Sequence, residues 1–421
     1  MASLPQIDHV PTQSIKKFSS ISLEGPIDFN STFSENYLDL IRNFDMELIG
    51  KFKINTVPNI LRSDAQAYQT ILASVLKGSV DAVEAAHEDR QLIYSRLLWL
   101  LPPLLLRNPK KLVSKRLQAF IQGDLETCFS GLCSTHDNHF AIQKTPASIH
   151  KLAADKVFNG QYSKAMMALL HQPSVATSEQ KKIAMTKKHP PRSDKDNMDI
   201  NRLIPSIYSP DITEDIVYTT AMKPSKRGVA PGPNGDRAEF LQSALYNPYS
   251  SSLSATVLHF LTRHINLERN GKLSEEWYQI STFSTLIAQG PKLRPIGMGY
   301  SGRKLVSGVS LTASAKEIIT SLAPFQLSSL VSNGSETVVH LIRKLHELYG
   351  NSHVFFQLDV ANAFNSVSRF KGLLAIARHL PYLYTYILRT YRIKNKLWVD
   401  ATDDQIRDHI LSQEGSIVYA N

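Results

Sequence analysis

The chain has 421 residues, 43% of them hydrophobic and 20% charged, so it is long and apolar enough for two or three domains and is not a largely disordered protein. Lys and Arg (47) exceed Asp and Glu (37), and the formal charge of +10 favours polyanionic partners such as nucleic acids. With only two cysteines, Cys128 and Cys133, a disulfide framework is excluded and a reducing, intracellular compartment is expected.

The first part of the chain divides into a polar tail and a helical region. Residues 1–50 are rich in Ser, Pro and Asn without a sustained period, which predicts a flexible tail. Residues 51–171 carry apolar residues at spacings of three and four, which predicts packed amphipathic helices. The apolar run 97–106 is short and interrupted by proline, so we expect a buried helix and turn there and no membrane association.

Two cysteines and two histidines lie close together in the pattern C-x4-C-x2-H-x2-H, formed by Cys128, Cys133, His136 and His139. Such residues can bind zinc, but structural zinc sites usually separate their two ligand pairs, whereas all four candidates crowd together in this chain. A helix end followed by a polar loop is therefore the favoured interpretation, and zinc is the alternative.

Residues 172–201 are polar and rich in Lys, which predicts a linker between the helical region and the next domain. A run of charge of this kind is usually a solvated face, although its lysines could also follow a nucleic-acid backbone. We therefore place a domain boundary at this linker.

A loop rich in Gly and Pro follows in 223–241. Its composition predicts a tight irregular turn before a helix, and glycine lets backbone N–H groups approach a phosphate closely. Basic side chains in the same stretch supply charge for such a contact. The candidate template or phosphate contacts are Lys226, Arg227, Gly232, Gly235 and Arg237.

A second basic stretch, 292–309, follows a strand expected over 283–289. Its cations surround a short strand and a turn with glycines, which suits a triphosphate because it offers fixed charge and little steric bulk. A basic surface hairpin is the alternative. The candidate nucleotide contacts are Lys292, Arg294 and Lys304.

Asp359 lies in a run of β-forming residues, 353–360, which predicts a short buried strand that ends near this carboxylate and leads into a turn and a helix. A carboxylate in so apolar a run is costly to bury unless it meets a metal or a basic side chain. The alternative is an Asp that caps the following helix.

The sequence FQLDVANAFNSVSR around Asp359 and Phe364 resembles the first catalytic motif of reverse transcriptases from non-LTR (LINE-like) retrotransposons. The Gly-rich loop resembles that family's ApGpDGl element, with Asn234 where an Asp is common, and the RPI segment at Arg294 resembles its phosphate-contacting element. Helical segments from about residue 95 onward resemble the region ahead of the polymerase.

The resemblance implies a function and a set of roles. Asp359 would be catalytic and bind Mg²⁺, Phe364 would underlie the incoming sugar, and a deoxynucleotide triphosphate would contact Arg294, Lys292 and Lys304. The implied reaction is RNA-directed DNA synthesis, with an RNA template and a DNA primer as partners and the nucleus as the location. The implied fold is α/β, in which a helical region precedes the fingers (202–345) and the start of the palm (346–421) of a right-hand polymerase.

The agreement ends near the last residues of the sequence. Ser412-Gln413-Glu414-Gly415 resembles the opening of the family motif SxEGxxQGDPL, in which Gly415 is a candidate template contact. No Y-x-D-D pair follows; Asp403-Asp404 lacks the aromatic residue and leads into an expected helix. Because two-metal catalysis needs more than one carboxylate, we expect this chain to be inactive alone. The alternatives are a non-catalytic nucleic-acid-binding remnant and a helical adaptor that uses 50–170.

Overall fold

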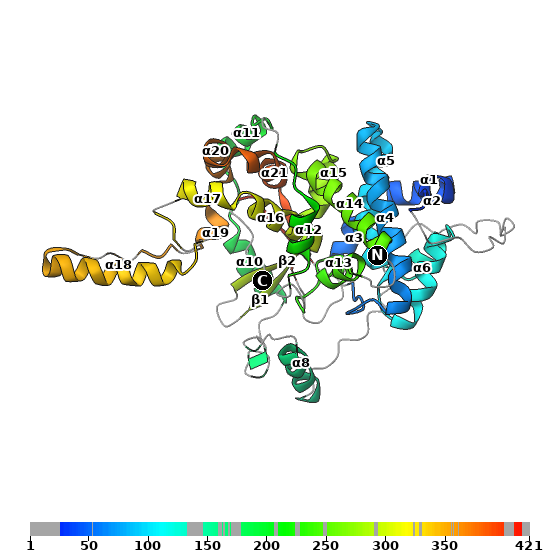
Figure 1. Ribbon diagram of the computed structural model, residues 1–421, viewed down its shortest axis with the longest axis horizontal. Helices are drawn as coiled ribbons and strands as arrows, with labels where there is room; N and C mark the ends of the chain where they lie inside the picture. Colours follow the sequence, from blue (N-terminus) through cyan, green and yellow to red (C-terminus); the bar gives the residue numbers. More distant parts are fainter. Residues whose placement is uncertain are drawn as a thin grey trace.

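The computed structural model describes residues 26–52, 54–132, 146–158, 178–205, 209–223, 228–246, 251–289, 294–322, 325–327, 331–354, 356, 358–360, 362–399 and 408–414, and the isolated positions 162, 165, 166 and 169. Most of these residues are helical, and a small four-stranded mixed sheet accompanies the helices (Figure 1). The expected α/β class agrees with this arrangement. In the described ranges, every helix is too short or too polar to cross a membrane.

A body of packed helices begins well before residue 51. The rings of Phe29, Phe33 and Phe120 pack against one another with centroids 4.9 to 5.3 Å apart, so the flexible tail expected over 1–50 is wrong for 26–50. The sequence did not reveal these helices because a few well-spaced apolar residues provide their packing in an otherwise polar stretch. The helices are α1 (Phe29–Thr32), α2 (Glu35–Asn43), α3 (Glu47–Lys51), α4 (Arg62–Glu84), α5 (Glu88–Leu105), η1 (Lys110–Leu112), α6 (Val113–Ile121) and α7 (Leu125–Phe129).

Helices α4 and α5 form the centre of this body. Trp99, Leu100 and Leu104 of α5 are 0% exposed, so the apolar run is buried helix, as expected. Helix α4 also packs along α14 (Ser251–Arg269), and the side-chain amide of Gln69 donates a hydrogen bond to the carbonyl of Ala244 at 2.8 Å. The first and second halves of the chain therefore share one core.

Residues 178–201 form two packed helices, α10 (Ser178–Lys188) and α11 (Asp194–Asn201), instead of an open linker. Met185 and Ile200 are 0% exposed, and Lys181 and Arg192 are also buried. The solvated charged face expected from composition is wrong for these residues, because two apolar side chains are enough to fix the segment on the body. Helix α8 (Pro146–Phe158) precedes them.

The sheet has the strand order β2-β1-β3-β4. Strand β1 pairs antiparallel with β2 and parallel with β3, and β3 pairs antiparallel with β4. Leu286, Leu397 and Ile410 form a small core with Met185 of α10. Strand β4 replaces the helix expected after Asp404. The strands are β1 (Ser284–Gln289), β2 (Arg294–Gly299), β3 (Asn395–Val399) and β4 (Asp408–Ser412).

Further helices make up most of the second half. The Gly-rich loop leads into α13 and the basic stretch begins with the strand β2, both as expected, but helix α16 follows β2 where only a turn was expected. Helices α20 and α21 pack against each other. The helices are α12 (Glu214–Ala221), α13 (Ala238–Leu245), α15 (Glu275–Ser281), α16 (Ser301–Ala313), α17 (Ala315–Leu322), α20 (Arg369–His379) and α21 (Pro381–Arg392).

One element projects away from the rest of the molecule (Figure 1). Helix α18 (Gly334–Tyr349) leads outward, and the chain returns through η4 (Gly350–Ser352) toward α19 (Ala363–Ser366). We call residues 334–360 the arm. The N-cap of α18 is Asn333, and Gly334 alone among the α18 residues is buried.

The buried strand predicted around Asp359 is absent. Val354, Phe356, Leu358 and Val360 are 76%, 86%, 89% and 67% exposed, and this stretch is not paired with any strand of the described sheet. The residues have strand character, but a strand is stabilised by cross-strand neighbours and by burial of one face, and the arm provides neither.

Candidate phosphate-binding site

Two stretches that the sequence singled out meet at one cavity. The Gly-rich loop contributes Arg237, and the segment that follows β2 contributes Arg303 and Lys304 of α16. Helix α21 contributes apolar and aromatic side chains to the lining, among them Leu383 and Tyr391. The cavity has a volume of about 770 Å³, and we call it the basic cavity.

At two positions of the loop, neighbouring atoms lie too close for any residue with a side chain, so glycine is required. Gly235 has φ +79°, and a Cβ atom there would lie 2.5 Å from the Cγ2 atom of Thr56. A Cβ at Gly232 would lie 2.9 Å from the carbonyl oxygen of Gly299 at the end of β2. The glycines therefore let the loop pack closely on the body and on β2, which brings its backbone to the cavity wall.

Asp236 joins the loop to α16. Its carboxylate accepts hydrogen bonds from the backbone N–H of Ser301, at 3.2 Å, and from the Ser301 hydroxyl. Burial raises the pKa of Asp236 to about 6. Because this carboxylate occupies the first turn of α16, the helix end is already capped, and attraction for an anion in the cavity must come from side chains. The sequence reasoning missed Asp236; its place directly after a PNG turn was the available signal.

Three cations line the basic cavity among its described residues: Arg237, Arg303 and Lys304. The Nε of Arg237 donates to the Thr56 hydroxyl at 3.3 Å, and burial lowers the pKa of this guanidinium. The guanidinium carbon of Arg303 lies 5.7 Å from the centre of the Tyr391 ring. Against these cations the described lining contains one carboxylate, that of Asp236, so the wall carries net positive charge and suits a phosphate.

A smaller cavity of about 60 Å³ lies behind this wall and also touches Asp236. Burial raises the pKa of Glu268, which lines it, to about 7 and lowers the pKa of His264 to about 4. At neutral pH His264 is uncharged and Glu268 is partly protonated. The interior beside the basic cavity therefore holds carboxyl groups that take up protons in the neutral range.

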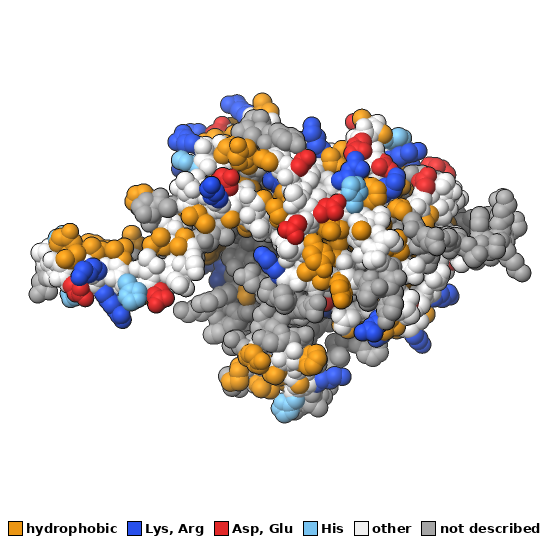
Figure 2. All heavy atoms as spheres, in the orientation of Figure 1, with side chains coloured by type: hydrophobic (Ala, Val, Ile, Leu, Met, Phe, Trp, Pro, Cys, Tyr) orange, Lys and Arg blue, Asp and Glu red, His pale blue; other side chains and the backbone are white. Residues whose placement is uncertain are grey.

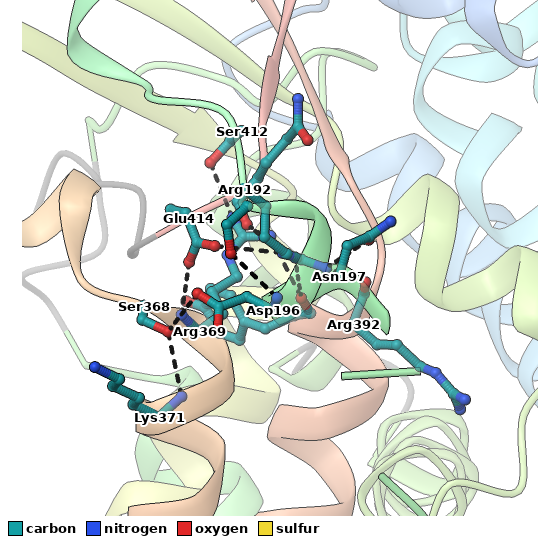
Figure 3. Close-up of polar contacts among 12 residues, drawn as sticks. Arg192, Asp196, Asn197, Ser368, Arg369, Lys371, Arg392, Ser412 and Glu414 are labelled. Atoms are coloured by element: carbon teal, nitrogen blue, oxygen red, sulfur yellow. Dashed lines mark hydrogen bonds and ion pairs between the residues drawn. The ribbon is translucent and has the colours of Figure 1, made fainter. Parts of the chain in front are cut away.

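A buried polar network joins three distant segments below the sheet (Figure 3). Glu414 accepts a hydrogen bond from the backbone N–H of Arg369 at 2.7 Å and lies 3.6 Å from the guanidinium of Arg192. Arg192 also donates to the carbonyl of Gln413 at 2.8 Å, and Arg369 donates to the Ser412 hydroxyl at 2.9 Å. The SxEG-like residues 412–414 are thus fixed by two buried arginines.

Some of the predicted phosphate and template contacts lie at the basic cavity, and others lie outside the residues that the structure describes. Gly232, Arg237 and Lys304 line the basic cavity, and Gly235 shapes the loop beside it. Arg294 begins β2, where its backbone faces Gln289, and its side chain is outside what the structure describes. Lys226, Arg227, Lys292 and Gly415 also lie outside the described residues.

Asp359 and Phe364 are not brought to the cavity. Both lie on or beside the arm, where Asp359 is exposed and Phe364 is 69% exposed. Within the described ranges no three His, Cys, Asp or Glu side chains are grouped so that they could hold a metal ion. The described residues therefore do not fit the Mg²⁺ site that the resemblance implies.

The zinc alternative lies mostly outside the described residues, which exclude Cys133, His136 and His139. Cys128 is buried in the helical body, where its Sγ donates to the carbonyl of Arg116 at 3.4 Å and burial raises its pKa to about 12. A thiol with a raised pKa is a poorer metal ligand, because zinc binds the thiolate. The helix-end interpretation suits Cys128, which lies on α7.

The chain matches no protein-family model, and a search of the curated proteins finds no match either. Any functional assignment therefore depends on the sequence motifs and on the cavity at which two of them meet.

Proposed function

We propose that this chain contains the fingers and the first part of the palm of an RNA-directed DNA polymerase of the non-LTR retrotransposon type. The observation that carries the proposal is the meeting of the Gly-rich loop and the β2–α16 segment at the basic cavity. The first segment resembles the family's ApGpDGl element and the second contains the RPI residues that resemble its phosphate-contacting element, and they are distant enough in sequence that nothing in their spacing requires them to meet.

In this proposal the basic cavity binds the phosphates of a deoxynucleotide triphosphate or of a template strand. A planar guanidinium binds phosphate oxygens in pairs, and the Lys304 ammonium adds a compact charge. Arg303 is buried and Arg237 is partly buried, so solvent screens their charges less than those of exposed side chains. Mg²⁺, which the polymerase reaction would require, remains an expectation of the resemblance, and no catalytic step is assigned to it.

Nucleotide binding tests the cavity directly. Lys304→Gln removes one cation from the wall, and Lys111→Gln is the matched control because Lys111 is exposed on η1, away from the cavity. Loss of one charge-assisted contact is worth about 1.5 to 3 kcal/mol, so the Kd for a deoxynucleotide triphosphate should rise roughly tenfold or more in the first variant and not in the second. Equal affinities for the two variants in a titration would exclude the basic cavity as the binding site.

The proposed partners are an RNA template and a DNA primer inside the nucleus. The net charge of +10 supports contact with their phosphate backbones. Binding to an RNA–DNA duplex should fall with salt, with a log–log slope of about −0.7 to −0.9 for each phosphate neutralised. A flat salt dependence would contradict this part of the proposal.

A second candidate function is a nucleic-acid-binding remnant without catalysis. The exposed position of Asp359, which belongs to no group of three or more possible metal ligands among the described residues, favours this candidate. Deoxynucleotide binding at the basic cavity, measured with Lys304→Gln as above, separates the two functions, because a remnant needs to bind only nucleic acid. Primer extension by the purified chain, with Asp359→Ala as control, should fail in both proteins, and extension that the variant loses would contradict the expectation that this chain is inactive alone.

A further inference from the structure

Three buried arginines gather around Tyr391, a residue of the basic-cavity lining. Over the face that Figure 2 shows, Lys and Arg side chains lie scattered among acidic and hydrophobic ones. Arg192, Arg303 and Arg369, in contrast, are only 6%, 7% and 4% exposed and come from three separate segments of the chain. A buried cation needs partners that offset the loss of its hydration, so the groups that hold these guanidiniums determine where their charge lies.

Tyr391 contacts all three arginines. Two guanidiniums lie over its ring, with their central carbons 5.7 Å (Arg303) and 5.1 Å (Arg369) from the ring centre. Its backbone carbonyl accepts hydrogen bonds from Arg192 and Arg369, both at 3.4 Å. The face of an aromatic ring carries partial negative charge and attracts a cation, more strongly where water is excluded. Tyr391 is therefore a common partner of the three cations.

Arg369 is itself held firmly by the buried polar network (Figure 3). Its guanidinium donates to the Ser412 hydroxyl at 2.9 Å and to the Ile393 carbonyl at 3.1 Å, and its backbone N–H donates to the Glu414 carboxylate at 2.7 Å. These bonds leave Arg369 little freedom to move. The position of the Tyr391 ring therefore depends on the same network.

Of the three arginines, Arg303 lines the basic cavity. Burial lowers the pKa of Arg369 to about 10, and the charge of Arg303 acts in the same direction, so these two guanidiniums repel each other. Glu268, which lines the smaller cavity, attracts Arg303: burial raises the pKa of this carboxyl, and the charge of Arg303 lowers it. The contact with the Tyr391 ring competes with the repulsion and with the pull of Glu268.

We propose that Tyr391 is a positioning residue, which holds the guanidinium of Arg303 in the wall of the basic cavity so that its N–H groups face the phosphates of the ligand. A guanidinium can lie over a ring and still donate from its edge to phosphate oxygens. The inference rests on the proposed function, because it needs a ligand with phosphates in the cavity. It adds that affinity depends on a ring and on the buried network behind it, in addition to the cations that meet the ligand.

Titration of the full chain with inorganic triphosphate tests this role. Tyr391→Leu keeps apolar bulk and removes the ring, and its Kd should rise roughly five- to tenfold, which is the usual size of a desolvated cation–π contact. Tyr391→Phe keeps the ring and removes only the hydroxyl, so its Kd should stay within about twofold of the wild-type value. A loss of affinity in both variants would assign the effect to the hydroxyl and overturn the proposal.

A comparison of double variants separates positioning from general packing. In an Arg303→Gln background, Tyr391→Leu should raise the Kd by less than about twofold, because the guanidinium that the ring holds is gone. In a Lys304→Gln background the same substitution should keep its full effect. An equal effect of Tyr391→Leu with and without Arg303 would overturn the proposal, since the ring would then act through packing alone.

Tyr382→Leu is the matched control, because Tyr382 lies on the same helix, is 42% exposed and is outside the described lining of the cavity. It should leave the Kd unchanged. Thermal unfolding shows that each variant is folded, and Tyr391→Met, which also lacks a ring and adapts to the space, takes the place of Tyr391→Leu if the latter does not fold.

The titration also distinguishes this inference from the function on which it rests. Triphosphate that binds none of the proteins, the wild-type chain included, would contradict the proposed function and the role of Tyr391 together. Equal affinities of the wild-type chain and Tyr391→Leu, with binding retained, would contradict the role of Tyr391 alone.

Discussion

The helical body and the arm each contain a long helix with large apolar side chains, and the two helices differ in what covers those side chains. In α5, Trp99 and Leu104 are 0% exposed, whereas in α18 Leu341 is 50% and Leu348 63% exposed. Both helices follow from the spacing of their apolar residues. The comparison teaches that a periodic sequence specifies a helix with an apolar face, while burial of that face depends on a second element that packs on it.

The largest expected contrast is between core truncations in the two regions. Trp99→Ala should lower the free energy of unfolding by about 3 to 5 kcal/mol, because it removes a fully buried ring and leaves a cavity. Leu348→Ala, on the arm, should change it by no more than about 0.5 kcal/mol. Urea unfolding followed by circular dichroism measures both. Comparable losses would mean that α18 is packed in solution and that the contrast is false.

Removing one partner of an ion pair should also lower the free energy of unfolding far more in the body than in the arm. Glu414→Ala leaves Arg192 and Arg369 buried without their carboxylate and should cost about 3 kcal/mol. Glu347→Ala removes the partner of Lys344 at 3.1 Å on the arm, where both side chains are about two-thirds exposed, and should cost nothing measurable. The same urea unfolding compares the two, and a neutral Glu414→Ala would show that the buried network does not hold the 412–414 segment.

Buried carboxyl groups should make the stability of the body depend on pH. The carboxyl of Glu268 titrates near 4.5 when unfolded and near 7 when folded. Between these values the folded state keeps a proton that the unfolded state has released, so the free energy of unfolding falls as the pH rises, by about 3 kcal/mol in total. Glu268→Gln should flatten most of this fall. Thermal unfolding between pH 4.5 and 7.5 measures it, and an unchanged slope in the variant would assign the dependence to another group, such as Asp236.

The smallest expected difference between the body and the arm is in the Tm of alanine variants at two glycines with positive φ. Gly235→Ala forces a Cβ to within 2.5 Å of a Thr56 side-chain atom in the body, whereas Gly350→Ala at the arm's tip meets nothing within 4 Å. The backbone strain of about 1 to 2 kcal/mol is common to both, but in the arm it can relax by a local turn of the chain. Gly235→Ala should therefore lower the Tm of the chain by several degrees and Gly350→Ala should leave it unchanged. Equal shifts would mean that the arm unfolds together with the body.

The sequence predicted many of the helices and the strand β1, because their apolar spacing matches the core that they face, and it predicted β2 as a short strand in the basic stretch. It also predicted the tight loop before α13, since Gly235 needs φ +79°. It did not predict α1 to α3 or α10, where single residues such as Phe29 and Met185 provide the packing in polar surroundings. The average composition of a segment does not reveal that a single apolar side chain within it packs into the core.

For the candidate site, the sequence identified the Gly-rich loop and the basic stretch but not their meeting point. Arg303 and Tyr391 reach the basic cavity from different elements, and only the tertiary arrangement brings them together. Asp236 could not be predicted because the residue that it caps, Ser301, lies 65 positions further along the chain. The strand at Asp359 was predicted from β-forming residues alone, which say nothing about whether a neighbouring strand is present.

The network around Glu414 has a consequence for the order in which the chain folds during synthesis. Arg192 leaves the ribosome long before its partner, since its contact with the Gln413 carbonyl joins residues 221 apart in the sequence. Until 412–414 are made, Arg192 and Arg369 lack the Glu414 carboxylate that lies against both, and burying two like charges together is unfavourable without it. The α10–α11 segment therefore completes its packing only after β4 has been translated. A nascent chain can form the helical body early, but the junction of α11, α20 and the sheet is among the last parts to become native.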